Sequence, residues 1–128
     1  MTKKRDDHEF RLSCAVADYL GFALPDHVQW THFPAGEERT ASAGKRLKRL
    51  GTKPGWPDYI VLPGGGQVLF IELKKPETDT PAGRLSPAQK AFKSWCAEHG
   101  YNHFVCQSTA DVQAALECCG VQIKARVA

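Results

Sequence analysis

Hydrophobic and polar positions alternate with two different periods along the chain. Apolar residues spaced three or four apart predict helices over residues 6 or 7 to 20, 38–50, 86–100 and 109–118. Alternating or wholly apolar runs predict strands over residues 28–33, 58–62, 68–74 and 102–107, with an edge strand over 121–127. The order α-β-α-β-β-α-β-α-β predicts one α/β domain over residues 1–128, a central mixed β-sheet flanked by helices.

Capping residues set the expected ends of these helices. Gly21 is expected to stop the first helix, and Ser86-Pro87 provides an N-cap followed by proline at the first helical position. In that later helix, the spacing of Phe92, Trp95 and Cys96 places them on the face expected to point inward.

Composition indicates an ordinary globular domain. The 128 residues are 42% hydrophobic and 24% charged, and no apolar run approaches the length of a membrane span. The chain has five cysteines: Cys14, Cys96, Cys106, Cys118 and Cys119. Their number is odd and no two form a CxxC pair, which favours reduced, largely buried thiols in the cytosol.

The net charge is only +3, but basic residues are concentrated in one segment. Residues 39–53 contain no acidic residue and include Arg39, Lys45, Arg46, Lys48, Arg49 and Lys53. Such a basic block suits the phosphate backbone of DNA. A solvated helix face accounts for the same charges equally well.

The two strands either side of residues 63–67 predict a cluster of ionisable groups. A symmetric hairpin centred on Gly65 pairs Leu62 with Val68, Ile60 with Phe70, and Asp58 with Glu72. Opposed side chains share a face about 5 Å apart, and Lys74 follows on that same face.

Two carboxylates and a lysine at the end of a buried hairpin suit phosphodiester hydrolysis. Carboxylates hold Mg²⁺, which polarises the phosphoryl group and activates water, and an ammonium stabilises the developing charge. Taken alone, the spacing also fits a surface salt bridge at a strand end.

Three motifs in order resemble the PD-(D/E)xK nuclease superfamily, and within it the VRR-NUC family. They are Gly55-Trp56-Pro57-Asp58, Ile71-Glu72-Leu73-Lys74 and Ser86-Pro87-Ala88-Gln89. The resemblance extends from Glu9 to the end of the strand around Val105 and implies a restriction-endonuclease-like core. The chain looks like the standalone form found in phages and prophages, which implies the cytoplasm of a bacterial host.

By this resemblance, Asp58 and Glu72 are metal ligands, the carbonyl of Leu73 completes the site, and Lys74 is the catalytic lysine. The implied cofactor is Mg²⁺ or Mn²⁺. The implied activity is a DNA endonuclease that uses a metal-bound water. The competing hypothesis is a non-catalytic nucleic-acid-binding domain that keeps the fold.

Two further residues match the family pattern and also have local explanations. Glu9 matches a glutamate on the first helix that assists the metal, and it also completes a capping box with Asp6. Gln89 matches a glutamine that supports the lysine or the scissile phosphate, and it forms the same kind of box with Ser86.

Other chemistry-bearing side chains are expected to be structural. His99 and His103 are interpreted as surface residues that Gly100 keeps off a common face, and His32 as a half-buried core histidine. Trp56 is expected either to stack on a base or to pack against the sheet.

The resemblance also concerns assembly. Standalone VRR-NUC proteins are understood to form dimers that cut four-way junctions, and a twofold dimer supplies two active sites from one chain. A homodimer acting on branched DNA is therefore expected. The strand predicted over residues 121–127 is a candidate for pairing across the interface, or for a protected edge.

Overall fold

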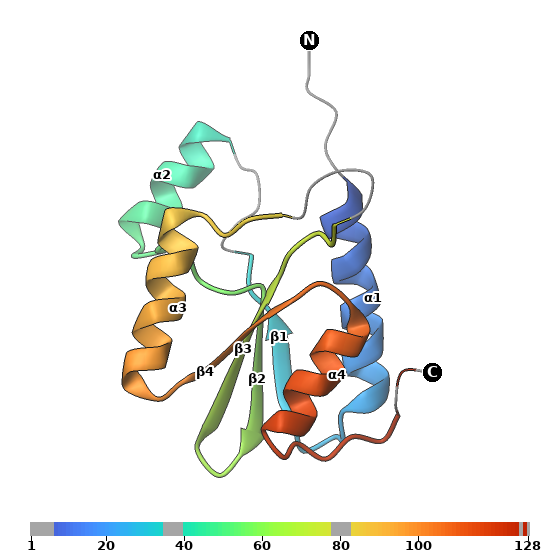
Figure 1. The fold of residues 1–128 in the computed structure, drawn as a ribbon. Coiled ribbons are helices and arrows are strands. Elements are labelled where there is room, and N and C mark those ends of the chain that lie inside the picture. The colour runs from blue at the N-terminus through green and yellow to red at the C-terminus, as the bar shows by residue number, and fades with distance from the viewer. Residues whose placement is uncertain (1–6, 35–39, 78–82, 126, 128) are drawn as a thin grey trace.

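A mixed β-sheet lies at the centre of the molecule (Figure 1). The computed structural model describes residues 7–34, 40–77, 83–125 and 127. In these residues the strand order is β1-β2-β3-β4, with β1 Gln29–His32, β2 Tyr59–Gly64, β3 Gln67–Leu73 and β4 Asn102–Cys106. The first three strands pair antiparallel, whereas β4 runs parallel to β3. The predicted mixed sheet is confirmed.

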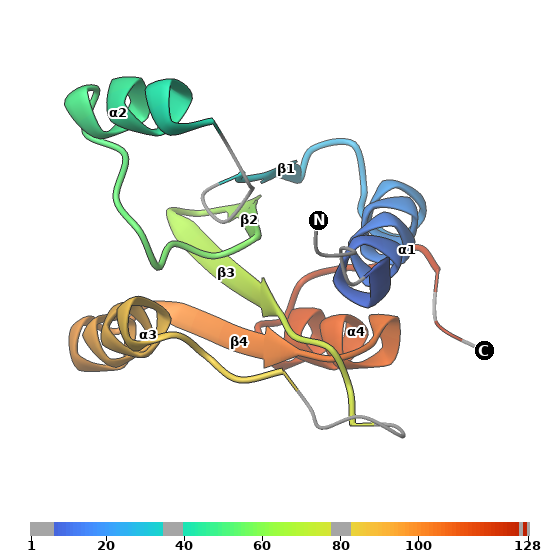
Figure 2. The same ribbon diagram turned by 90° about the horizontal axis from the view of Figure 1, so that it is seen from above.

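Helices cover both sides of this sheet. Their bounds are α1 Asp7–Ala23, α2 Ala41–Arg49, α3 Pro87–His99 and α4 Thr109–Cys118. Figures 1 and 2 show α1 and α4 on one side of the sheet and α2 and α3 on the other. None of the helices in the described ranges is long and apolar enough to span a bilayer.

The main core lies between the sheet and the pair α1 and α4. Leu20 of α1, Leu69 and Ile71 of β3, and Leu116 of α4 are fully buried there. Each such side chain contributes roughly 1.5–3 kcal/mol when it leaves water, so this layer holds the end of β3 firmly in place.

The β2–β3 hairpin has the predicted register near the candidate site. Its pairs are Tyr59 with Ile71, Ile60 with Phe70 and Val61 with Leu69. The register then shifts before the turn, where Gly64 pairs with Gln67, so the expected pairing of Leu62 with Val68 falls in an irregular stretch. Gly65 and Gly66 form the turn with φ of 63° and 78°, a conformation that glycine adopts without strain.

Two helix ends differ from the prediction. The first helix continues through Gly21 to Ala23, because Ala23 and Leu24 are buried and the Leu24 N–H still bonds to the Leu20 carbonyl at 3.1 Å. Packing thus outweighs the roughly 1 kcal/mol cost of an internal glycine. The second helix begins after the N-cap Thr40 rather than at residue 38, and residues 35–39 lie outside the described part.

The predicted C-terminal strand is wrong. Residues 121–125 and 127 have no strand structure; instead the Lys124 N–H donates to the carbonyl of Ala23 at 2.6 Å. Val121 is buried and Ile123 packs against the core. The alternating apolar residues of this segment therefore pack at the end of α1 and do not form a β-strand.

Candidate active site

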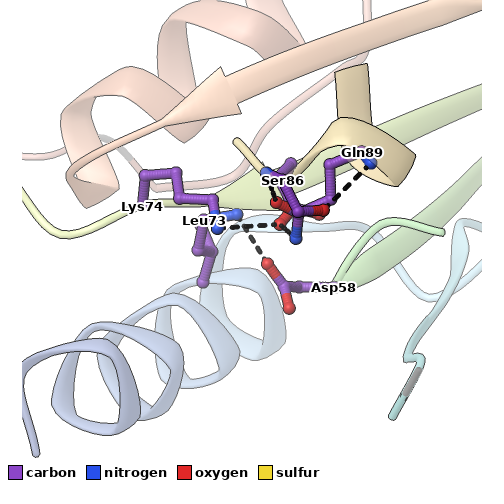
Figure 3. A network of polar contacts seen from close by, with 6 residues as sticks. Asp58, Leu73, Lys74, Ser86 and Gln89 are labelled. Atoms are coloured by element: carbon purple, nitrogen blue, oxygen red, sulfur yellow. Dashed lines mark hydrogen bonds and ion pairs between the residues drawn. The ribbon is translucent and has the colours of Figure 1, made fainter. Parts of the chain in front are cut away.

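Asp58 is fixed directly before β2 by contacts with β3. Its backbone N–H donates to the Ile71 carbonyl at 3.0 Å, and its Oδ2 accepts the Leu73 N–H at 2.6 Å (Figure 3). The side chain is half-buried. Asp58 and Glu72 thus lie next to each other as predicted, one residue beyond Tyr59 and Ile71, the last regular pair of the hairpin.

Among the described residues, Glu72 is the charged residue that is buried, with only 2% of its surface exposed. Its Oε1 accepts a hydrogen bond from Gln89 Nε2 at 2.6 Å and lies 3.8 Å from Lys74 Nζ. Both partners are at the same end of the sheet (Figure 3). A buried carboxylate needs such partners, because an unpaired charge away from water is costly.

Gln89 forms the predicted capping box and also contacts a carboxylate of the site. Its Oε1 accepts the Ser86 N–H at 2.8 Å, and its own N–H donates to Ser86 Oγ at 3.1 Å, which is a complete capping box at the start of α3. The remaining amide nitrogen reaches Glu72. The helix cap therefore orients a side chain of the site.

Lys74 follows the end of β3 and is anchored through its backbone. Its N–H donates to the Cys106 carbonyl at 2.9 Å, which ties it to β4. Gly83, nine residues further on, lies between this lysine and α1: a Cβ there would be 3.4 Å from Lys74 Cδ and 3.6 Å from Glu9 Oε1. Glu9 of α1 thus belongs to the same cluster, while Asp6 lies outside the described residues.

The carboxylates repel one another. Burial, and then the charge of Asp58, raises the pKa of Glu72 to about 8, against the attraction of Lys74. Burial also raises the pKa of Asp58, although the hydrogen bond from Leu73 and the charge of Lys74 lower it. Glu9 raises both pKa values. One lysine does not neutralise this cluster, and a divalent cation would lower the pKa values of Asp58 and Glu72.

The donor set fits a hard, well-hydrated cation. Within the described ranges, no group of three or more His, Cys, Asp and Glu side chains has the arrangement of a metal-binding site. Mg²⁺ needs only one or two carboxylates, since it keeps several waters and binds substrate phosphate. The carboxylate oxygens of Asp58 and Glu72 match that requirement.

These residues open into a cavity of about 500 Å³ between α1 and the sheet. Glu9, Asp58, Glu72, Lys74 and Gln89 all line it. The cluster is therefore accessible from solvent although Glu72 is itself buried.

His32 also lines this cavity and was missed by sequence reasoning. The prediction of a half-buried core residue is wrong: His32 is exposed, 5.2 Å from the Tyr59 ring centroid, and its charge lowers the pKa of Asp58. The alternation correctly places His32 on the same face of β1 as Trp30. It does not show that this face borders the cavity at the end of the sheet. Tyr59 in turn shares a 2.8 Å hydrogen bond with Ser13 Oγ.

The basic block lies largely on α2, beside the site rather than in it. No residue of α2 is buried, and Lys45, Arg46, Lys48, Arg49 and Lys53 are exposed. Arg39 lies outside the described residues. The helix stands off the sheet on the α3 side (Figure 2), so its charges are not engaged in packing the core.

The other singled-out side chains lie in different surroundings. Trp56 packs against Phe92 and Phe70, with ring centroids 4.9 and 6.2 Å away. His103 is half-buried rather than at the surface, because Phe92 covers it, whereas His99 is exposed and stacks on Trp95. The cysteines are free; Cys96 and Cys106 are buried as predicted, whereas Cys14 and Cys118 are exposed.

Comparison with known families agrees with this geometry. The model of the VRR-NUC domain matches residues 19–110, a range that holds Asp58, Glu72, Lys74 and Gln89 but not Glu9. The chain belongs to the VRR-NUC family. Membership places it among a family of nucleases with a DNA substrate and confirms the predicted resemblance.

A solved structure shares the VRR-NUC fold. This "VRR_NUC domain protein" superposes with a TM-score of 0.62 and 23% identity, over 90% of this chain and 89% of that one. None of the curated proteins compared with the chain matches it. The nuclease-like fold is thus established.

Proposed function

We propose that this VRR-NUC chain is a Mg²⁺- or Mn²⁺-dependent DNA endonuclease, and that residues 1–128 form a single nuclease domain. The observation that carries the proposal is the environment of Glu72. A buried carboxylate is contacted by Gln89 and Lys74 and lies beside Asp58, in a cavity open to solvent. Such opposed carboxylates destabilise a fold unless a cation lies between them.

Asp58 and Glu72 are the metal ligands in this proposal, with the Leu73 carbonyl and Glu9 as further donors. A bound metal polarises the phosphoryl oxygen and lowers the pKa of a water. The protein holds the ligands in place: Asp58 through the Leu73 N–H, and Glu72 through the Gln89 amide.

Lys74 is the catalytic lysine. Its ammonium lies 3.8 Å from Glu72 at the mouth of the same cavity, where it can stabilise charge developing on the scissile phosphate. Gln89 is a positioning residue, because it orients Glu72 from the start of α3.

The basic residues would bind the phosphate backbone on either side of the site. They are Arg39, Lys45, Arg46, Lys48, Arg49 and Lys53, most of them exposed on or after α2. Their charges fit a polyanion and make binding dependent on salt.

Branched DNA, such as a four-way junction, is the proposed substrate, and a homodimer the proposed assembly. Two cuts need two sites, and a twofold dimer provides them. The C-terminal segment no longer supports this proposal, since Lys124 is bonded to Ala23 of the same chain. A phage-encoded protein in the bacterial cytoplasm fits the same standalone type.

A non-catalytic nucleic-acid-binding domain is the alternative. The exposed charges of α2 would serve such a domain equally well. Burial and the charge of Asp58 raise the pKa of Glu72 to about 8. A domain that only binds DNA has no use for such a glutamate, which favours the enzyme.

A cleavage assay separates the two. The purified chain is incubated with linear duplex, supercoiled plasmid and four-way junction DNA, each with Mg²⁺, Mn²⁺ or EDTA, with Asp58→Asn as the matched control. Cleavage that requires metal and Asp58 supports the proposal. Binding of the same DNAs without any cleavage would establish the binder.

A further inference from the structure

Exposed aromatic side chains gather on the α3 side of the molecule. Trp56, Trp95 and Tyr101 have 38%, 46% and 43% of their surface exposed. Sequence spacing predicted that Trp95 faces the core, which is wrong: Cys96 takes the buried position and Trp95 lies at the surface. Large aromatic residues clustered at a surface mark a binding site more often than singly scattered ones do.

These rings form one connected set, here called the aromatic row: Phe33, Trp56, Phe92, Phe70, Tyr101 and Trp95. Successive centroid distances along it are 5.9, 4.9, 5.3, 6.1 and 5.4 Å. At its outer end, Trp95 is stacked with Tyr101 at 24° and with His99 at 18°. Both rings keep exposed surface beside these contacts, 46% for Trp95 and 43% for Tyr101, which a further flat ring can contact.

The aromatic row begins at the candidate site. Phe33 lines the cavity of Asp58 and contacts Trp56, which precedes Asp58 by two residues. Gln89 and Trp95 are six residues apart on α3, about 9 Å along the helix axis. The row therefore leads away from the site. Phe70 within it is buried, so Trp56 on the side of the site and Tyr101 and Trp95 at the other end are the rings exposed to a ligand.

The charges around the row suit an anionic ligand. Lys53 precedes Trp56, and Lys90 and Lys93 are exposed on α3, whose single acidic residue is Glu98. The basic helix α2 lies on the same side of the sheet (Figures 1 and 2). Cations next to exposed aromatic rings match a nucleic acid strand, which has a phosphate backbone and flat bases.

We propose that the aromatic row binds unpaired nucleotides next to the cut site, through stacking of bases on Trp95, Tyr101 and Trp56. The inference rests on the proposed function. Bases within a duplex are already stacked on each other, whereas those of a single strand are free to stack on protein rings. Among branched DNAs, the preferred substrate is then one with unpaired nucleotides next to the branch.

The test measures binding in EDTA, so that no cleavage is needed. A labelled eight-nucleotide thymidine strand is titrated against the chain by fluorescence anisotropy. Trp95→Ala and Tyr101→Ala are compared with Phe22→Ala, which removes a 77% exposed aromatic ring from α1. Circular dichroism verifies that each variant is folded.

We expect Trp95→Ala and Tyr101→Ala to weaken binding of the single strand roughly 10-fold, with Phe22→Ala unchanged. The salt dependence should not change, whereas Lys93→Ala should reduce it. Equal affinity for all aromatic variants would overturn the proposal. If these variants lose as much affinity for duplex DNA as for the single strand, the proposal is also overturned. The same holds if they dissociate a dimer and still bind the single strand normally.

The outcome is independent of catalysis. If Asp58→Asn abolishes cleavage but Trp95→Ala binds normally, the inference fails and the proposed function stands. If Trp95→Ala loses strand binding in a chain that never cleaves, the surface is real and the nuclease assignment fails.

Discussion

Gln89 donates its amide hydrogen to Oε1 of Glu72 at 2.6 Å while its carbonyl oxygen accepts the N–H of Ser86. One side chain thereby joins the start of α3 to the buried carboxylate of the site. The proposed function therefore couples stability and catalysis at this residue, and two variants can separate them.

Ser86→Ala and Gln89→Ala each remove part of the capping box and should each lower the free energy of unfolding by about 1 kcal/mol. Gln89→Ala also frees Glu72, so it should reduce cleavage roughly 10- to 100-fold more than Ser86→Ala. Chemical denaturation and initial cleavage rates, measured on both proteins, test this. Equal rates for the two variants would assign Gln89 to the helix cap alone.

Removing the charge of Glu72 should stabilise the metal-free protein in alkaline buffer. The folded-state pKa of about 8 is above the usual value of 4.5, so the contribution of this group is complete below pH 4.5 and is lost as pH rises through 8. At pH 9 in EDTA, Glu72→Gln should be more stable by at least about 1 kcal/mol, or about 3–5 °C in Tm.

Thermal unfolding between pH 4 and 9 provides the measurement. The advantage of Glu72→Gln should disappear near pH 4, where the wild-type carboxyl is protonated, and Mg²⁺ at pH 8 should stabilise the wild type but not the variant. An advantage that does not depend on pH would show that repacking, rather than charge, is responsible.

Lys74 and Asp58 should affect different steps. Lys74→Ala should lower cleavage by at least about 100-fold, because it removes charge stabilisation in the transition state, and leave Mn²⁺ binding largely intact. Asp58→Asn should weaken Mn²⁺ binding itself. Calorimetry without DNA, combined with cleavage rates, separates the two; a failure of Lys74→Ala to bind metal would make that lysine structural.

The charges of α2 should determine the salt dependence of DNA binding. Replacing Lys45, Lys48 and Arg49 together by alanine should reduce the slope of log affinity against log salt by about 0.9 for each phosphate that is no longer neutralised. Lys124→Ala, an exposed lysine on the C-terminal segment, is the control. If the slope of the triple variant is unchanged, α2 is a solvated helix that does not contact DNA.

Assembly is tested by light scattering at micromolar concentration, with and without a four-way junction. A homodimer should have about twice the 14.1 kDa mass of the chain and should place paired nicks on a junction in preference to linear duplex. A stable monomer without junction preference would remove the dimer from the proposal and leave the nuclease assignment intact.

Local chemistry made much of this fold predictable. Ser86, Pro87 and Gly100 fix both ends of α3, and the symmetric pairing around Gly65 placed Asp58 beside Glu72 even though the register shifts near the turn. The approach of Glu9 to Gly83 and Lys74 had no such signal, because Glu9 lies on the first helix, far from both in the sequence.

The errors have a common physical origin. The alternation around Val121 and Ile123 is real, but it fits the end of α1 as well as a sheet. Trp95 has helical spacing that suits the core, yet its neighbour Cys96 takes the buried position of α3 and Trp95 is exposed. Periodicity gives the face of a residue and not what lies against that face.

The hydrogen bond from the Leu73 N–H to Asp58 Oδ2 makes one backbone amide a spectroscopic reporter. A hydrogen bond to an ionised acceptor is stronger than one to a neutral carboxylic acid. The amide resonance of Leu73 should therefore shift as Asp58 gains a proton or a metal ion, and its hydrogen exchange should slow when the carboxylate is held in place. A single peak can thus follow the charge state of the site through a titration with acid or with metal.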